Sequence, residues 1–412
     1  MTLAIIGAGA AGLMAAATIL ELDPSVEIFL IEKNNGIGKK VLISGGGRCN
    51  VTTGLRDVRE VLKRYPRGGK FLSSAMYQFP PEEVYRWFEA HSVPLKTEED
   101  LRVFPQSDNG RDVVGVFDRL FTRENVHLWL NASVTNVKKT EDGFSLTIKG
   151  REAEPLVVDR LIITTGGQAY RQTGSTGDGY AFAQALGHTI TSLAPSLSAF
   201  FTKETWPHQL AGLSFERAKL TADRPSGATF EGPILFTHKG LTGPAVFALS
   251  SIVAFAPFDA ARPLHITVDL FPARSVADLQ GELQNKIREF PRKSWVNVLS
   301  MSIPKSLAEM TCEQNEISPE KHAAEVSKQE LTRICGWLKA IPLTVVARGA
   351  GDEFVTAGGV TLEEVDPSTM ESKVCPGLFF AGEVLDIDGF TGGFNLQASW
   401  ATGRLAGREV VA

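Results

Sequence analysis

The chain has 412 residues, of which 43 % are hydrophobic and 22 % are charged. That composition is typical of a globular protein and excludes disorder as the main state, and the length indicates two or three domains. The 42 basic and 47 acidic side chains give a net charge of −5, which argues against a duplex-DNA binder. No run of about 18 apolar residues occurs, so the sequence predicts no membrane span.

The chain opens with an apolar run, residues 3–6, which predicts a buried strand. Residues 7–12 then have the pattern G-x-G-x-x-G, and a helix is expected from about residue 10 to residue 21. A second apolar strand, residues 26–31, ends in Glu32. This order of strand, glycine turn, helix, strand and acid predicts a βαβ unit that binds a dinucleotide. The alternative is an ordinary βαβ crossover with a glycine-rich turn.

Each residue type in this unit has a physical reason. Gly7 permits the tight turn, Gly9 lets the backbone approach a pyrophosphate, and Gly12 lets helix and strand pack closely. The helix N-terminus offers free N–H groups to the phosphates. Glu32 is expected to accept hydrogen bonds from ribose hydroxyls and to repel a 2′-phosphate, which disfavours NADP. The candidate cofactor contacts here are Gly7, Gly9, Ala10, Ala11, Gly12, Glu32 and Lys33.

Further glycine-rich segments occur at residues 36–50, 164–167, 382–383 and 392–395. Residues 44–50, S-G-G-G-R-C-N, suggest backbone lying against a flat or charged ligand, with a flexible linker as the alternative. Glycine sites at both ends of the chain imply one long ligand or two ligands. The candidate contacts are Lys40, Ser44, Gly45, Gly46, Gly47, Arg48, Asn50, Thr165, Gly166, Gly167, Gly382, Glu383, Asp386, Gly393, Phe394 and Asn395.

These segments resemble the two-dinucleotide-binding-domain flavoproteins and, more narrowly, the bacterial aminoacetone-oxidase-like FAD flavoproteins. The resemblance is carried by residues 40–50, V-F-P at 103–105, G-S-T-G-D-G-Y at 174–180, L-F-T-H-K-G-L-T-G-P at 235–244, T-A-G-G-V at 356–360, and residues 380–397. It implies that FAD is the cofactor, with its ADP half on the opening βαβ unit and the backbone of Val134 against adenine. It also implies that Gly382 and Glu383 reach the pyrophosphate and the ribityl chain.

The expected fold class is α/β: a Rossmann-like FAD-binding domain interrupted by a small β-barrel or sandwich and a helical insert. The predicted domains are residues 1–193 and 351–412 for FAD, 194–274 and 340–350 for the β-rich domain, and 275–339 for the helical subdomain. The first part is expected to hold a helix at residues 81–90 and a strand meander from residue 127 to residue 149.

Several polar residues are candidates for chemistry or capping. His238 is glycine-bounded and its ordinary pKa suits proton transfer near neutrality; the alternative is a hydrogen-bonded loop residue. Arg48 is a candidate anchor for a substrate carboxylate or a flavin phosphate, and Asn50 a candidate for the flavin ring. Asp178 and Asn395 are interpreted as helix N-caps. Of Asp386 and Asp388, one is expected at the ribityl chain and the other as a surface charge.

The four cysteines lie far apart with no Cys-x-x-Cys pair, which favours a reducing cytoplasm and predicts no metal site. Cys49 is interpreted as a small buried residue rather than a nucleophile.

The expected function is a cytoplasmic FAD-dependent oxidoreductase that transfers hydride through flavin N5 from NAD(P)H to a small organic acceptor such as an enone or a carbonyl compound. A second G-x-G-x-x-G is missing, so NAD(P)H is expected to bind only transiently. The alternatives are an amine or aminoketone oxidase that uses oxygen, a flavin-dependent RNA-modifying protein, and a flavin-binding scaffold without turnover. The expected partner is a small molecule, with no nucleic acid and no membrane; the oligomeric state is not predicted.

Overall fold

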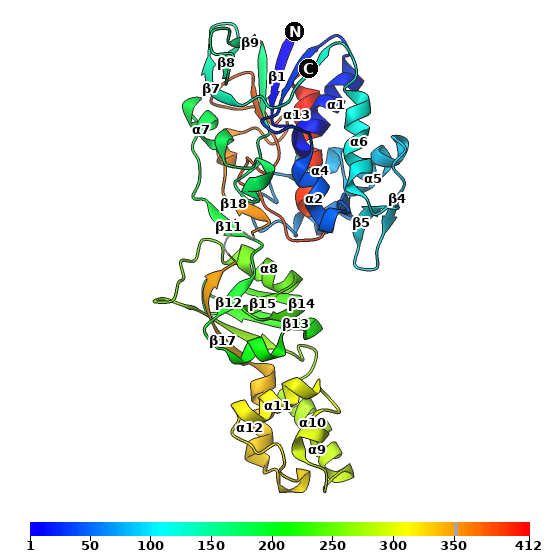
Figure 1. Cartoon of the computed structure of the whole chain (residues 1–412), viewed down its shortest axis with the longest axis vertical. Helices are drawn as coiled ribbons and strands as arrows, with labels where there is room; N and C mark the ends of the chain where they lie inside the picture. Colours follow the sequence, from blue (N-terminus) through cyan, green and yellow to red (C-terminus); the bar gives the residue numbers. More distant parts are fainter. Residues whose placement is uncertain (350–352) are drawn as a thin grey trace. The chain divides into compact units, whose positions relative to one another are not determined.

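The computed structural model describes residues 1–349 and 353–412, which form two compact units. The first unit combines Met1–Ser196 with Glu353–Ala412, and the second is Leu197–Asp352 (Figure 1). The first unit therefore uses both ends of the chain, and the second interrupts it. The expected boundary between residues 350 and 351 lies outside the described residues.

A parallel sheet forms the centre of the first unit. Its strand order is β19-β10-β1-β2-β6, and every neighbouring pair is parallel. The run Leu3–Ile6 is almost completely buried, as a strand covered on both faces requires. The strands are Thr2–Ile6 (β1), Glu27–Ile31 (β2), Val126–Trp129 (β6), Arg160–Ile163 (β10) and Leu378–Phe380 (β19).

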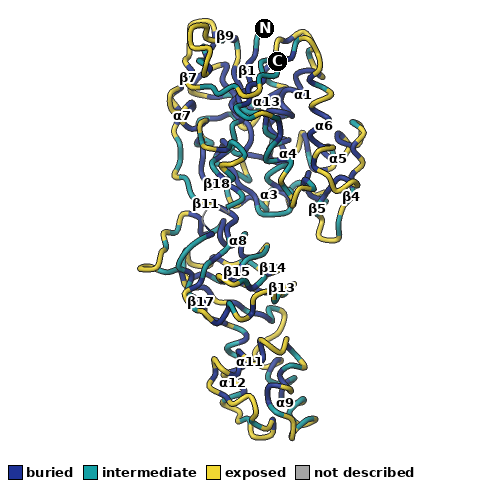
Figure 2. Tube along the Cα trace, in the orientation of Figure 1, coloured by how far each residue is buried: buried dark blue, intermediate teal, exposed yellow. Residues whose placement is uncertain are grey.

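The first and last helices of the chain pack against each other. A Cβ on Gly403 of α13 (Phe394–Glu409) would lie 2.3 Å from the Ala11 carbonyl oxygen of α1 (Ala10–Leu22), and one on Gly407 would lie 2.5 Å from that of Ala15. The missing side chains allow this close approach, and both helices are mostly buried (Figure 2). Because position 403 meets 11 and 407 meets 15, the two helices run in the same direction.

Small sheets and short helices complete the first unit. The predicted meander is wrong at its start, because Val126–Trp129 pairs with β2 in the main sheet rather than with β7. The small sheets are β3 (Thr52–Thr53) with β5 (Arg102–Pro105) and β4 (Leu95–Thr97); β7 (Val134–Lys139) with β8 (Phe144–Ile148) and β9 (Leu156–Val158); and β11 (Ala194–Ser196) with β18 (Val355–Ala357). The helices are α2 (Lys39–Ile43), α3 (Val58–Leu62), α4 (Ser73–Gln78), α5 (Pro81–Ala90), α6 (Gly110–Leu120) and α7 (Asp178–Ala185), with 3₁₀ turns η1 (Ser44–Gly47), η2 (Arg171–Thr173) and η5 (Leu362–Glu364).

The second unit contains a closed barrel and a group of helices. The barrel order is β12-β15-β14-β13-β16-β17, and its interior is lined by residues such as Phe200, Phe236 and Val345. The strands are Phe200–Thr202 (β12), Ser214–Ala222 (β13), Thr229–Thr237 (β14), Gly240–Thr242 (β15), Leu264–Asp269 (β16) and Ile341–Arg348 (β17). The helices are α8 (Pro244–Ile252), α9 (Val276–Glu289), α10 (Trp295–Leu299), α11 (Lys305–Gln314) and α12 (Lys328–Lys339), with η3 (Trp206–Leu210) and η4 (Ala323–Glu325).

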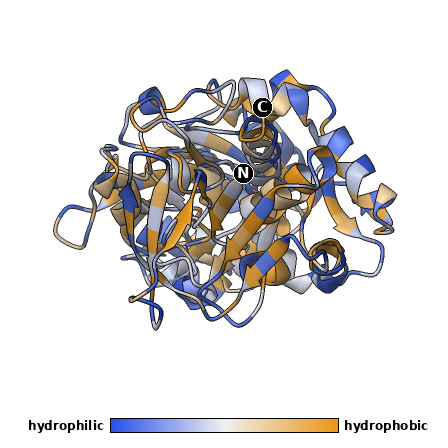
Figure 3. Ribbon diagram, turned by 90° about the horizontal axis from the view of Figure 1, so that it is seen from above, coloured by the Kyte–Doolittle hydropathy of each residue, from blue (hydrophilic) through white to orange (hydrophobic). Residues whose placement is uncertain are grey.

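The expected fold class is confirmed: a Rossmann-like domain is interrupted by a barrel and helices. Hydrophobic residues gather in the central strands and helices, while peripheral segments carry hydrophilic ones (Figure 3). Among the described residues, no helix has both the length and the apolar character needed to cross a bilayer.

Candidate functional site

The opening glycine turn has two glycines that the fold requires and one that it leaves open. Gly7 has φ +105°, and a Cβ on Gly12 would lie 2.0 Å from the Gly7 carbonyl oxygen. A Cβ on Gly9, by contrast, meets no atom within 4 Å. Gly9 is the N-cap of α1 and supplies no side-chain cap, and the first turn carries no acid. The turn thus presents open backbone and a positive helix end, which fits a pyrophosphate.

Glu32 stands at the end of β2 beside this turn. One carboxylate oxygen accepts the Ala8 N–H at 2.9 Å, and the other accepts the backbone and side-chain N–H groups of Asn34 at 2.8 and 2.7 Å. The side chain is only 8 % exposed, so its charge is held in place by these donors. Lys33 turns elsewhere: its ammonium group pairs with Asp178 at 2.5 Å.

The C-terminal strand brings a second glycine–acid pair to the same place. Gly382 has φ +78°, and a Cβ on it would lie 2.9 Å from the Cβ of Ala11 in the opening helix. Glu383 accepts a hydrogen bond from Lys40 Nζ at 2.8 Å and another from the Thr356 N–H at 2.8 Å. A Cβ on Gly167 would lie 3.0 Å from Glu383 Oε1. Segments that are separated by hundreds of residues therefore converge beside α1.

The glycine turn at residues 44–47 has a supported side and an open side. Gly45, Gly46 and Gly47 have φ values of +57°, +72° and +89°, which explains three successive glycines. A Cβ on Gly45 would lie 2.8 Å from the Phe104 ring, so that side is packed. A Cβ on Gly46 or Gly47 meets no atom within 4 Å, which leaves the backbone free to lie against a ligand.

The closing helix begins beside this turn, and its expected cap is wrong. The N-cap of α13 is Gly393 in a left-handed conformation, with no side-chain cap and no acid in the first turn. The Asn395 side chain instead accepts the Gly389 N–H at 2.8 Å and donates to the Gly389 carbonyl at 2.8 Å. A Cβ on Gly393 would lie 3.0 Å from Asn50 Oδ1, so the start of α13 lies against the residues that follow the glycine turn.

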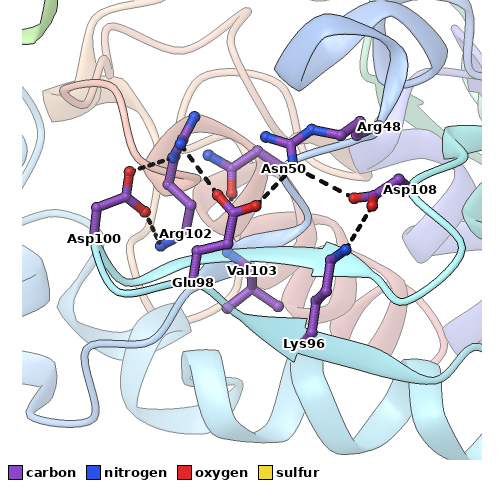
Figure 4. Close-up of polar contacts among 8 residues, drawn as sticks. All are labelled: Arg48, Asn50, Lys96, Glu98, Asp100, Arg102, Val103 and Asp108. Atoms are coloured by element: carbon purple, nitrogen blue, oxygen red, sulfur yellow. Dashed lines mark hydrogen bonds and ion pairs between the residues drawn. The ribbon is translucent and has the colours of Figure 1, made fainter.

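Arg48 points toward the β4–β5 hairpin. Its Nη1 donates to Glu98 at 2.7 Å and to Asp108 at 3.3 Å (Figure 4). Its guanidinium also lies 3.7 Å from the centre of the Phe104 ring. The Glu98 carboxylate raises the pKa of Arg48. The Arg48 side chain thus interacts with protein groups, and its assignment to a substrate carboxylate or flavin phosphate stays a prediction. Asn50 accepts the Val103 N–H with its Oδ1 at 3.3 Å, and its assignment to the flavin ring also stays a prediction.

The two aspartates after Glu383 differ from expectation, because neither is a surface charge. Asp388 is 1 % exposed and pairs through both oxygens with Arg67. Asp386 is partly buried, burial raises its pKa, and its Oδ1 has no hydrogen-bond partner in the described chain. The buried Tyr180 hydroxyl is also without a partner there. The sequence analysis did not single out Arg67 or Tyr180: no local pattern marks Arg67, and Tyr180 ends the G-S-T-G-D-G-Y segment, which gives no sign that its hydroxyl is buried.

The remaining candidates lie as follows. His238 is exposed in the turn between β14 and β15, in the second unit. Val134 begins β7, and Cys49 is completely buried, which raises its thiol pKa to about 12. Asp178 is the first residue of α7 rather than its N-cap, which is Gly177. The roles of His238 and Val134 stay predictions.

The chain is similar to several known proteins. A family model described as "HI0933-like protein Rossmann domain" matches residues 1–409. The chain is 30 % identical over 410 residues to the 3-dehydro-bile acid delta(4,6)-reductase of Clostridium scindens, covering 98 % of this chain and 97 % of that protein. It is 28 % identical over 412 residues to the ribosomal RNA dihydrouridine synthase of Escherichia coli, covering 99 % and 97 %. A solved E. coli quinol fumarate reductase chain has a TM-score of 0.51 at 16 % identity, covering 100 % of this chain and 70 % of that chain; this likeness shows the fold alone.

Proposed function

Since this chain belongs to the HI0933-like Rossmann-domain family of FAD-binding proteins, we propose that it is an FAD-dependent reductase of a carbon–carbon double bond conjugated to a carbonyl group. NAD(P)H is the electron donor in this proposal, and the acceptor is a small organic molecule. Bound FAD would supply a hydride donor at N5 of its reduced ring.

The stagger of two helix N-termini is the observation that carries the proposal. Helix α13 begins nine residues before Gly403, whereas α1 begins one residue before Ala11, which Gly403 contacts. At 1.5 Å per residue, the N-terminus of α13 therefore lies roughly 12 Å beyond that of α1 along the same direction. Two positive helix ends at this separation suit one extended ligand with negative charge at two places.

The residues around these helix ends have distinct tasks in the proposal. Glu32 holds the ribose hydroxyls, and the open backbone at Gly9 receives the pyrophosphate. Gly46 and Gly47 give the flavin ring a surface without side chains. The start of α13 favours negative charge, so it would stabilise the reduced, anionic ring.

The choice of acceptor rests on the relatives' names. A delta(4,6)-reductase of a 3-dehydro-bile acid and a dihydrouridine synthase both saturate carbon–carbon double bonds. In each substrate that bond is conjugated to a carbonyl, which draws electron density from the carbon that receives hydride. The uracil ring in RNA is the second candidate acceptor, favoured by a relative that matches 99 % of the chain.

Anaerobic titration of the purified yellow protein tests the proposal. NADH or NADPH should bleach the flavin absorbance, and a conjugated dienone bile acid should restore it without oxygen. Restoration by a uridine-containing ribosomal RNA fragment, but not by the dienone, would move the assignment to the second candidate. Bleaching by aminoacetone, with no response to NAD(P)H, would instead identify an amine oxidase of the narrower aminoacetone-oxidase-like type and refute the proposal.

A further inference from the structure

We propose that the β4–β5 hairpin is an ionic clamp on the glycine turn, with Arg48 as its positioning residue rather than a ligand contact. The clamp consists of Arg48, Lys96, Glu98, Asp100, Arg102 and Asp108 (Figure 4). It rests on the proposed function in one respect, which is that the open face of the turn receives the flavin. The hairpin in turn determines how rigid the backbone of the glycine turn is.

The ion pairs form one continuous series, in which Arg48 of the glycine turn lies between Glu98 and Asp108. Glu98 accepts Arg48 at 2.7 Å with one oxygen and Arg102 at 3.1 Å with the other. Asp108 likewise joins Arg48 at 3.3 Å to Lys96 at 2.6 Å. Each carboxylate therefore bridges two cations, and Arg48 is the one member that belongs to the glycine segment.

Phe104 packs against both Arg48 and the glycine turn, and so connects the ion pairs to the turn. Its ring lies under the Arg48 guanidinium at 3.7 Å, and a Cβ on Gly45 would meet the same ring at 2.8 Å. The backbone joins in, because the Val51 N–H donates to the Val103 carbonyl at 2.9 Å, which starts the pairing of β3 with β5. On a second side, a Cβ on Gly110 would lie 3.2 Å from the Gly47 carbonyl oxygen, so α6 also supports the turn.

The charges make this grip sensitive to salt. The clamp side chains are between 29 % and 53 % exposed, so each single pair is screened and weak. Glu98 joins two of the pairs, and removing its charge should loosen both without touching the open face of the turn. Glu98→Gln is therefore the sharpest variant, and Arg86→Gln is its matched control because Arg86 holds two exposed acids on α5.

The experiment combines FAD affinity with hydrogen exchange of the flavin-free protein. We expect Glu98→Gln and Arg48→Gln to weaken FAD binding by a similar factor, about three- to tenfold, with Arg48→Lys rescuing part of the loss. High salt should weaken FAD binding of the wild type and of Arg86→Gln, and weaken that of Glu98→Gln much less. The amides of residues 44–50 should exchange faster in flavin-free Glu98→Gln than in wild type.

Two outcomes would overturn the clamp. In the first, Glu98→Gln keeps wild-type affinity and exchange. In the second, Arg48→Gln alone loses FAD and shifts the flavin midpoint potential, which would make Arg48 a direct ligand contact. If the wild type bound no FAD, the proposed function would fail, while faster exchange at residues 44–50 in Glu98→Gln would still support the clamp.

Discussion

Gly9→Val tests whether the space beside Gly9 in the opening turn is needed by the ligand or by the fold. Gly9 has φ −83° and ψ −173°, an extended conformation that valine also adopts. Its added Cβ meets no atom within 4 Å, so the folded chain has room for it. We therefore expect flavin-free Gly9→Val to lose only about 1 kcal/mol of stability, the order of an N-cap substitution.

The cost to FAD binding should be much larger, because the new side chain occupies the space above the first-turn N–H groups. Loss of two hydrogen bonds to a charged phosphate, at about 1.5–3 kcal/mol each, predicts FAD binding at least roughly 100-fold weaker. Flavin fluorescence titration measures the affinity, and thermal unfolding of the flavin-free protein measures the stability.

Gly12→Ala is the matched control with the opposite pattern. Its Cβ would lie 2.0 Å from the Gly7 carbonyl oxygen, so it should destabilise even the flavin-free protein by about 1–3 kcal/mol or more. The reasoning is refuted if Gly9→Val binds FAD as tightly as wild type. It is equally refuted if flavin-free Gly9→Val is as unstable as Gly12→Ala.

Three further predictions follow from single side chains. Burial lowers the pKa of His188 in the folded state, so its contribution to stability is complete above about pH 6.5 and is lost as pH falls below that value. Urea unfolding at several pH values should show that the free energy of unfolding falls less steeply toward acid pH in His188→Gln than in wild type. Equal slopes for the two proteins would contradict this prediction. Glu32→Gln should weaken FAD binding about tenfold by loss of one charged acceptor, whereas Glu27→Gln at the start of β2 should not. Equal affinities of the two variants in a fluorescence titration would argue against a ribose contact. Asn395→Asp adds a carboxylate to the first turn of α13 and should make the flavin midpoint potential more negative by dye equilibration; an unchanged potential would place the ring elsewhere.

Local patterns were sufficient for the elements that bury their own apolar residues. The opening strand, the opening helix and α5 at Pro81–Ala90 all lie within one residue of their expected bounds, and the N-cap of the closing helix lies two residues from the expected one. Strand β6 was misassigned because its hydrogen bonds go to β2, about 100 residues earlier. A short apolar run looks alike in a meander and in a parallel sheet, and only the partner distinguishes them.

The charged partners could not be predicted for the same reason. Arg67 and Asp388 are 321 residues apart, and Arg48 meets Glu98 across 50 residues. Spacing along the chain holds no signal for either pair. Asn395 shows a different failure: a cap was expected from residue type, but the Gly389 backbone takes both of its hydrogen-bonding groups.

The helices of this chain differ in how the free N–H groups at their N-termini are capped. In the second unit, α9 and α12 begin with complete capping boxes, from Ser275 with Asp278 and from Ser327 with Glu330. Helices α1 and α13 begin instead at glycines with no side-chain cap and no first-turn acid. A cap would stabilise each of these helices by about 1 kcal/mol, so its absence at both staggered N-termini is costly unless another group satisfies the free N–H donors. An anionic ligand that spans both ends would do so, and this is the physical reason to expect flavin-free protein to gain stability when FAD is added.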